Sequence, residues 1–239
     1  MRQIKTIVRM SDQGVSLPFL CKDEEEASWW CKGHLSGEQT QRYEWVCANL
    51  AKHLSLPIPD FEIMEVPIHL FNLWQTGNPA CKDLFVTQSN SFVFASRHVP
   101  GCWDLSENSP FLVKGDRDLQ ARILVFDRII RNTDRTDVNS NVLVNASEED
   151  IRIIDHNLAF NPAFDDKTFL EEHVFRGAFL SLAPEERANL VEGIFQKVAT
   201  FDLDAVWNEM PDPWTVEIDT GLTLDDVRGI LFTRWSPLP

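Results

Sequence analysis

Apolar residues recur every three or four positions in two long stretches of the chain, which is the spacing of one face of an amphipathic helix. The first helix is expected to begin at Ser36 or Gly37 and to run to about residue 54. Its apolar face comprises Tyr43, Val46, Leu50 and Leu54. The sequence Leu-Pro-Ile-Pro at 56–59 ends this helix, because proline lacks a backbone donor and disfavours helix in the residue before it.

The second helical stretch follows Asp116 and reaches the polar segment around residue 132. Its apolar face comprises Leu119, Ile123, Phe126 and Ile130. Four more helices are expected near 167–173, 184–199, 203–209 and 223–234. Pro184 suits a first helical position, and Thr223 with Asp226 suits a capping box. The C-terminal half of the chain is therefore predicted to be mainly helical.

Short runs rich in β-branched and aromatic residues predict strands in the N-terminal part of the chain. These runs are 4–8, 27–33, 61–66 and 90–95. In the second run, the period of two places Trp30 and Lys32 on the same face, with Trp30 packing inward or beneath a ligand. The polar segment 9–18 between the first two runs is either a hairpin turn or a loop over phosphates. Gly14 gives it backbone freedom, and Ser16 gives it a hydroxyl.

A polar loop and two short apolar strands follow the second helix. Asp134 lies in the loop with Asn139 and Asn141 just after it, and Asp155 ends the second strand. Because two short strands joined by a turn pair as a hairpin, Asp155 is expected to return beside the loop. Each residue alone is typical of turns, since Asn and Asp bond their own backbone. Together, carboxylates and an amide oxygen are ligands for a hard cation and suit Mg²⁺-dependent phosphoryl transfer.

Composition narrows the class of protein. The chain has 239 residues, enough for two lobes, and an apolar content of 44% argues against general disorder. A net charge of −15 argues against a nucleic-acid-binding surface and means that bound phosphates would need local compensation. The apolar runs are too short for a membrane-spanning helix, and the segment 1–10 lacks the apolar core of a signal peptide, so neither is expected. Five scattered cysteines without a Cys-x-x-Cys pair predict a reducing, cytoplasmic location.

The ordered set Asp-x-x-x-x-Asn, strand, strand, Asp resembles the catalytic loop and metal-binding Asp of the protein-kinase-like fold. The sequences NTDR at 132–135 and IDHNLAF at 154–160 most resemble those of HipA-like kinases and are similar to those of type II phosphatidylinositol 4-kinases. The resemblance implies a two-lobed α+β protein-kinase-like fold that uses ATP and Mg²⁺. A small β-rich N-lobe would span 1–95, and a mainly helical C-lobe would span 96–239.

The same resemblance implies roles for individual residues. Asp134 would be the catalytic base, and Asn139 and Asp155 would bind Mg²⁺. Asn139 has the usual spacing from Asp134, whereas Asn141 directly abuts the following strand and is the alternate ligand. The sequence departs from ordinary protein kinases in two places. Asn132 replaces the His of the His-Arg-Asp signature, and His156-Asn157 replaces the Phe-Gly that follows the metal-binding Asp.

In the N-lobe, the resemblance places an ion pair between Lys32 of the second strand and Glu44 of the first helix. This pair would position the α- and β-phosphates of ATP, and Gly14 and Ser16 would belong to the phosphate loop. From the residues alone, Lys32 and Glu44 are each more typical of a solvated surface, so the order of elements carries the assignment. Arg135 either steadies phosphates or pairs with a carboxylate, and Asp127 is expected to bond loop backbone groups or pair with Arg131.

The sequence therefore predicts an ATP- and Mg²⁺-dependent kinase, and the resemblance implies a protein Ser/Thr acceptor. Three alternatives stay open at this point. A nucleotide-binding pseudokinase would bind ATP without transfer and act as an interaction module. A lipid kinase would share the catalytic loop but would lack an evident basic membrane surface in so acidic a chain. A metal-dependent phosphohydrolase would use Asp127, Asp134 and Asp155 around cations and would not need Lys32.

Overall fold

The computed structural model describes residues 1–11, 18–32, 37–70, 91–105, 116–145, 150–215 and 221–233. The chain forms two compact units, each built from three segments. Unit 1 comprises Met1–Trp45, Pro59–Val99 and Asn208–Gly221, and unit 2 comprises Val46–Ile58, Pro100–Trp207 and Leu222–Pro239. The division into functional lobes at residue 95 stays a prediction.

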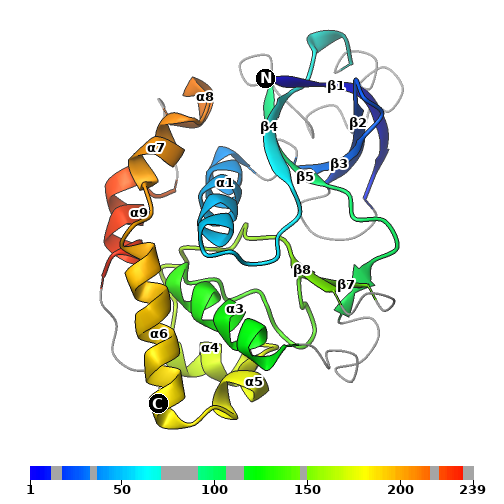
Figure 1. Ribbon diagram of the computed structural model, residues 1–239. Helices are drawn as coiled ribbons and strands as arrows, with labels where there is room; N and C mark the ends of the chain where they lie inside the picture. The colour runs from blue at the N-terminus through cyan, green and yellow to red at the C-terminus, as the bar shows by residue number, and fades with distance from the viewer. Residues whose placement is uncertain are drawn as a thin grey trace. The chain divides into compact units, whose positions relative to one another are not determined.

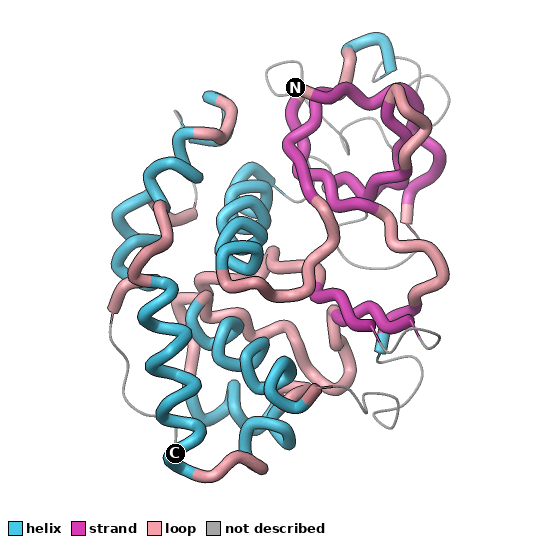
Figure 2. The backbone as a smooth tube through the Cα atoms, in the orientation of Figure 1, coloured by secondary structure: helices cyan, strands magenta, loops and turns pink. Residues whose placement is uncertain are grey.

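Unit 1 contains a small closed β-barrel, which appears as a ring of strands in Figures 1 and 2. Its strands are β1 (Arg2–Met10), β2 (Phe19–Asp23), β3 (Ser28–Cys31), β4 (Phe61–Glu65) and β5 (Phe92–Arg97), in the order β1-β2-β3-β5-β4. Neighbouring strands are antiparallel except for β1 and β4, whose parallel pairing closes the ring. The sequence predicted β1, β3, β4 and β5 but missed β2. Closure into a barrel depends on pairing between distant segments, such as β1 with β4.

The barrel interior is filled by alternate residues of the strands. Phe19 and Cys21 of β2 and Trp29 and Cys31 of β3 are almost completely buried in one apolar cluster. Of the two positions expected for Trp30, packing inward was therefore wrong: Trp30 lies on the other face, where its indole N–H bonds Nδ1 of His98 at 3.1 Å. Packing beneath a ligand stays a prediction. The strand also ends at Cys31, so Lys32 follows it. Two adjacent tryptophans give no sequence signal for which of them faces the core.

Helix α1 (Gly37–His53) begins in unit 1 and ends in unit 2. The predicted apolar face is confirmed, since Tyr43, Val46, Leu50 and Leu54 are all at most 4% exposed. The chain leaves the helix through Ser55, whose φ of 56° is left-handed, and reaches the two predicted prolines. Within unit 2, Arg122 donates to the backbone oxygen of Leu54 at 2.7 Å and fixes this helix end.

The described part of unit 2 is mainly helical. Its helices are α3 (Arg117–Ile129), α4 (Asp166–Glu172), α5 (Arg176–Leu180), α6 (Pro184–Val198), α7 (Leu203–Asn208), whose last residue is assigned to unit 1, and α9 (Leu224–Leu231). The sequence predicted all of these except α5, and it also missed α8 (Asp212–Thr215) of unit 1. The capping box at the start of α9 is confirmed, because Thr223 and Asp226 each bond the other's backbone N–H.

A three-stranded antiparallel sheet in unit 2 carries the predicted hairpin. It consists of β6 (Trp103–Asp104), β7 (Val142–Asn145) and β8 (Asp150–Ile153), with β7 in the middle. The hairpin register pairs Val142 with Ile153 and Val144 with Ile151. Because all four side chains are buried, slipping the register by one residue would expose them. This register fixes where the polar residues on either side of the hairpin lie. Among the described helices, none is long and apolar enough to span a bilayer.

Candidate functional site

The predicted ion pair between Lys32 and Glu44 is present in unit 1. The Nζ atom of Lys32 lies 3.0 Å from Oε1 of Glu44, and the two side chains are 10% and 2% exposed. Glu44 lies on the buried side of α1 beside Tyr43, so it is not the exposed helix residue that its type alone would suggest. Buried charges of this kind need a partner, because each loses several kcal/mol of hydration.

A glutamine that the sequence analysis overlooked holds Lys32 in place. The side chain of Gln41, on α1, donates to the backbone oxygen of Lys32 at 2.7 Å and accepts from the backbone N–H of Phe94 at 2.6 Å. The backbone N–H of Lys32 in turn donates to the oxygen of Phe94 at 3.0 Å. The lysine is thus fixed between β5 and α1, and Gln41 lies one helical turn from Glu44.

In unit 2, the hairpin brings together Asp134, Asn141 and the backbone that leads to Asp155. The Nδ2 atom of Asn141 donates to Oδ2 of Asp134 at 3.0 Å. The backbone oxygen of Asn141 accepts from the N–H of Ile154 at 3.0 Å, immediately before Asp155. Two carboxylate-bearing segments therefore meet at a single asparagine, as the predicted hairpin required.

Asn141 and Asp155 both have left-handed backbone conformations, with φ values of 49° and 57°. This region is uncommon for residues other than glycine and costs free energy, although Asn and Asp adopt it more readily than most. Such conformations persist only where the surrounding contacts hold them, and they are frequent at functional sites. Here they turn the chain sharply into β7 and out of β8.

Asn139, which the sequence spacing favoured, occupies a different position. Its side chain is exposed, and its Nδ2 atom reaches only the backbone oxygen of Asp134, at 3.4 Å. Thr136 and Asn139 close a tight turn through a backbone bond of 2.9 Å, so residues 137–139 protrude from the loop. Asn141, by contrast, is 7% exposed and contacts the Asp134 carboxylate itself.

The donor set at this loop suits a hard cation such as Mg²⁺ only if it includes an amide oxygen. In the described part of the chain, no group of three His, Cys, Asp or Glu side chains could hold a metal ion by itself. The amide nitrogen of Asn141 donates to Asp134, so the amide oxygen is the atom left to face a cation. Carboxylate and amide oxygens are the ligands that Mg²⁺ takes, usually with several waters retained.

A buried charge cluster lies behind the loop. Arg135, Asp127 of α3 and His173 are all at most 2% exposed. The Nε atom of Arg135 donates to Oδ2 of Asp127 at 2.6 Å, and Nε2 of His173 lies 3.0 Å from the same oxygen. The expected pairing of Asp127 with Arg131 was therefore wrong, and Arg135 pairs with a carboxylate instead of lying open to a phosphate. The partner eight residues away lies beyond the i+4 reach considered on a helix.

Electrostatics in this cluster favour a charged Asp127 and a neutral His173. Burial alone would raise the pKa of Asp127, but Arg135 and His173 together hold that pKa well below its ordinary value. Burial lowers the pKa of His173 below its ordinary value, although Asp127 acts against that shift. The Nδ1 atom of His173 accepts from the backbone N–H of Phe175 at 3.1 Å, so Nε2 carries the proton donated to Asp127.

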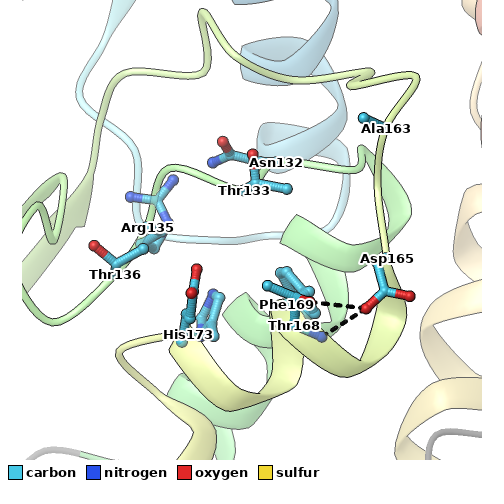
Figure 3. Close-up of a pocket in the computed structure, with 10 residues that line it drawn as sticks. Asn132, Thr133, Arg135, Thr136, Ala163, Asp165, Thr168, Phe169 and His173 are labelled. Carbon is cyan, nitrogen blue, oxygen red and sulfur yellow. Dashed lines mark hydrogen bonds between the residues drawn. The ribbon is translucent and has the colours of Figure 1, made fainter.

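Figure 3 shows a pocket on one side of the loop. Loop residues 132–136 other than Asp134 line one wall, and α4 with His173 lines the other. Asp165, which caps α4, accepts from the N–H and hydroxyl of Thr168, both at 2.9 Å. Asp134 does not line this pocket, and its carboxylate bonds Asn141 instead. The pocket is therefore separate from the carboxylate of the predicted base.

His156 and Asn157 occupy the two positions where ordinary protein kinases have Phe-Gly. His156 is 1% exposed, and its ring meets the ring of Phe126 edge-on, with 5.7 Å between centroids. An aromatic side chain is therefore still buried after Asp155. Asn157 does not have a positive φ, so no glycine is required at that position. The two remaining predicted residues, Gly14 and Ser16, lie outside the described residues.

Comparisons with known proteins bear on the fold and the family. A family model for HipA-like kinases matches residues 4–232. The crystal structure of the Helicobacter pylori proinflammatory kinase CtkA aligns with a TM-score of 0.56 at 10% identity, over 97% of this chain and 91% of its own. The Golgi casein kinase aligns with a TM-score of 0.50 at 12% identity, over 97% and 69%. A search of curated proteins gave no significant match.

The two structural likenesses, at such low identity, establish a kinase-like fold with mixed helix and strand content. The family match establishes more, because it covers nearly the whole chain, including the loop around Asp134 and the segment after Asp155. The resemblance seen in the sequence is thereby confirmed: the chain belongs to the HipA-like kinase family.

Proposed function

We propose that this protein transfers the γ-phosphoryl group of ATP to a hydroxyl acceptor in a Mg²⁺-dependent reaction. The observation that carries the proposal is the meeting of Asp134, Asn141 and the segment of Asp155 at the base of the hairpin. Membership of a kinase family supports the same reaction. The buried Lys32–Glu44 pair supports it independently, since a phosphohydrolase has no need of such a pair.

Each residue has a distinct role in this proposal. Asp134 orients the acceptor hydroxyl and accepts its proton, and Asn141 and Asp155 are the residues that would hold Mg²⁺. We prefer Asn141 to Asn139 because Asn141 is buried and contacts the Asp134 carboxylate, whereas Asn139 is exposed. When bound there, Mg²⁺ would supply positive charge to offset the charge that develops on the transferring phosphoryl group.

Lys32 is proposed to bind the α- and β-phosphates, with Glu44 holding its ammonium group. The long-range potential of a chain with a net charge of −15 would repel nucleotide phosphates. A lysine fixed by Glu44, and located by the Gln41 bond to its backbone, would offset that repulsion locally. Gly14 and Ser16 would add backbone amides and a hydroxyl, as the sequence predicts.

The acceptor is proposed to be a protein Ser or Thr hydroxyl. The family resemblance supports this choice, and one of the similar structures is named as a kinase of casein, a protein. The scattered cysteines still predict a reducing, cytoplasmic location, and the four that the structure describes form no disulfide with one another. The proposed acceptor and the expected location both rest on observations other than the geometry around Asp134.

The decisive experiment follows transfer of label from γ-labelled ATP in the presence of Mg²⁺, both to the protein itself and to proteins of a cell lysate. Asp134→Asn and Asp155→Asn are each expected to abolish transfer. Asp137→Asn is the matched control, because Asp137 is an exposed carboxylate of the same loop and pairs with Arg176 at 2.7 Å. Normal transfer by a folded Asp155→Asn protein would overturn the proposal. Mg²⁺-dependent ATP binding by the wild type without transfer to any acceptor would identify a pseudokinase.

A further inference from the structure

We infer that Arg135 is a positioning residue that sets the geometry of the Mg²⁺-holding side chains through their backbone. This inference rests on the proposed function. Arg135 follows the proposed base directly, and its guanidinium reaches the segments that carry both proposed metal-holding residues. It contacts neither ATP nor acceptor in this account, because its side chain is completely buried and paired with Asp127.

The guanidinium bonds the backbone on both sides of the hairpin. Its Nη1 atom donates to the backbone oxygen of Asn141 and, at 3.3 Å, to that of Ile154. A longer contact of 3.4 Å reaches the backbone oxygen of Ser140. Since Asn141 is proposed to hold the cation and Ile154 precedes Asp155, one side chain connects the backbone of both ligands.

The other side of the guanidinium is anchored to α3. Its Nε and Nη2 atoms donate to the two oxygens of Asp127 at 2.6 and 3.4 Å. The same carboxylate also accepts from Nδ2 of Asn132 at 3.0 Å and from His173. Asp127 is therefore fixed by three side chains, and Arg135 has little freedom to shift.

The loop backbone is fixed on this side as well. The backbone oxygen of Arg135 accepts from the N–H of Val174 at 3.1 Å, and Thr136 pairs with His173 as an isolated β-bridge. The side-chain amide oxygen of Asn132 accepts from the backbone N–H of Asp134 at 3.2 Å. The proposed base and the guanidinium thus belong to one rigid loop.

This geometry requires an arginine. A guanidinium presents five N–H donors in a planar fork, so it can bind a carboxylate with one edge and carbonyl oxygens with the other. Lysine carries a single ammonium group on a flexible stem and cannot reproduce both edges. The two residues being held, Asn141 and Asp155, have left-handed backbones that depend on surrounding contacts. Loss of the carbonyl contacts should therefore move the ligands without exposing the core.

The test compares Arg135→Lys with Arg128→Lys. Arg128 is a matched control, because it is also almost fully buried, on α3, and binds Asp166 at 2.7 Å. The measurement is the affinity for a non-hydrolysable ATP analogue with and without Mg²⁺. Groups that orient metal ligands typically contribute about 10- to 100-fold to metal affinity. Mg²⁺ is expected to increase the affinity of the wild type for the analogue, and Arg135→Lys should reduce that increase by about the same factor. The affinity measured without Mg²⁺ should be unchanged.

A second readout does not depend on nucleotide binding. The N–H of Ile154 bonds the same Asn141 oxygen that Arg135 holds, so its hydrogen exchange reports on the local geometry. We expect at least about 10-fold faster exchange in Arg135→Lys than in Arg128→Lys, with the amides of α3 exchanging as in the wild type. Should Arg135→Lys fail to fold, Asp127→Asn, which removes the charge that anchors the guanidinium, replaces it in both measurements.

The outcomes separate the two proposals. An unchanged Mg²⁺ effect and unchanged Ile154 exchange in a folded variant would overturn the role of Arg135, even if the wild type transfers phosphate. A wild type that binds no Mg²⁺–nucleotide would instead count against the proposed function, and the exchange of Ile154 would still decide whether Arg135 positions this backbone. A general loss of stability, with equal losses of nucleotide affinity in the presence and absence of Mg²⁺, would show a structural role and overturn the inference.

Discussion

Lys32 and Glu44 form an ion pair of 3.0 Å between the residue after β3 and the first half of α1, with both side chains almost fully buried. Removing one partner of a buried pair leaves the other charge desolvated, which typically costs about 3 kcal/mol. We therefore expect Glu44→Ala to lower the free energy of unfolding by about 3 kcal/mol, measured by urea denaturation. Glu38→Ala, in the first turn of the same helix, is the control and should cost much less.

The same variant should also weaken nucleotide binding if Lys32 binds phosphates. Lys32→Met removes the charge outright, and its apolar stem is close in volume to that of lysine. Both Lys32→Met and Glu44→Ala should lower the affinity for ATP at least about 10-fold, since a charge-assisted bond to phosphate is worth about 1.5–3 kcal/mol. A phosphohydrolase that does not use Lys32 would keep full turnover in Lys32→Met, and that result would favour the hydrolase interpretation.

The buried cluster around Asp127 predicts a loss of stability on acidification. The pKa of His173 is lowered in the folded protein, so the unfolded chain takes up a proton that the folded one refuses once the pH falls below about 6.5. Stability is therefore fully present above that pH and falls below it, by at most about 1.4 kcal/mol per pH unit. Asp127, whose pKa is also depressed, contributes in the same direction at much lower pH.

His173→Gln isolates this contribution, because the glutamine amide can still donate to Asp127 but does not titrate. Urea titrations between pH 7.5 and 5.5 should give a shallower loss of unfolding free energy in the variant than in the wild type. His98 has a pKa lowered by burial and by Arg9, and it acts in the same direction in both proteins, so it cancels in the difference. Identical slopes would mean that His173 does not couple folding to pH.

His156 replaces a phenylalanine of ordinary kinases, and its burial against Phe126 predicts that an aromatic ring is what this position requires. His156→Ala should lower the free energy of unfolding by about 3 kcal/mol through the cavity it leaves, whereas His156→Phe should cost much less. Thermal unfolding of both variants provides the comparison. A His156→Phe protein as unstable as His156→Ala would show that the polarity of the imidazole, and not its volume, matters.

The sequence predicted those parts of the fold that rest on local periodicity. The apolar faces of α1 and α3, the hairpin of β7 and β8 and the capping box at Thr223 were all readable from spacing and residue type. The choice between Trp29 and Trp30 was not, because a single apolar pair fits either face of a strand. Closure of the barrel was equally inaccessible, since β1 and β4 pair across about 60 residues.

The candidate site also has parts that the local sequence predicts and parts that depend on distant segments. Residue types and order predicted Asp134 and Asp155, and the contacts on Asp134 come from Asn132 and Asn141 nearby. The contacts on Lys32 and Asp127 instead come from distant parts of the chain. Gln41 reaches Lys32 and Phe94 from a different element, and Asp127 receives His173 from 46 residues away. No periodicity links such residues. The left-handed backbone of Asn141, where the chain turns into β7, was not predicted either.

The two asparagines give the sharpest test of the site. Asn141 is buried and bonds the Asp134 carboxylate at 3.0 Å, whereas Asn139 is exposed and bonds only a backbone oxygen. Glycine is the appropriate replacement at both positions, because it accepts the left-handed backbone of Asn141 without strain.

Asn141→Gly should lower the rate of phosphoryl transfer by about 100-fold and raise the Mg²⁺ concentration needed for half-maximal rate, as expected for loss of a metal-holding group. Asn139→Gly should stay within a few-fold of the wild type in both measurements. The reverse result, with Asn139→Gly inactive and Asn141→Gly normal, would restore the choice that the sequence spacing favoured and would require the exposed loop at 137–139 to fold inward when Mg²⁺ and nucleotide bind.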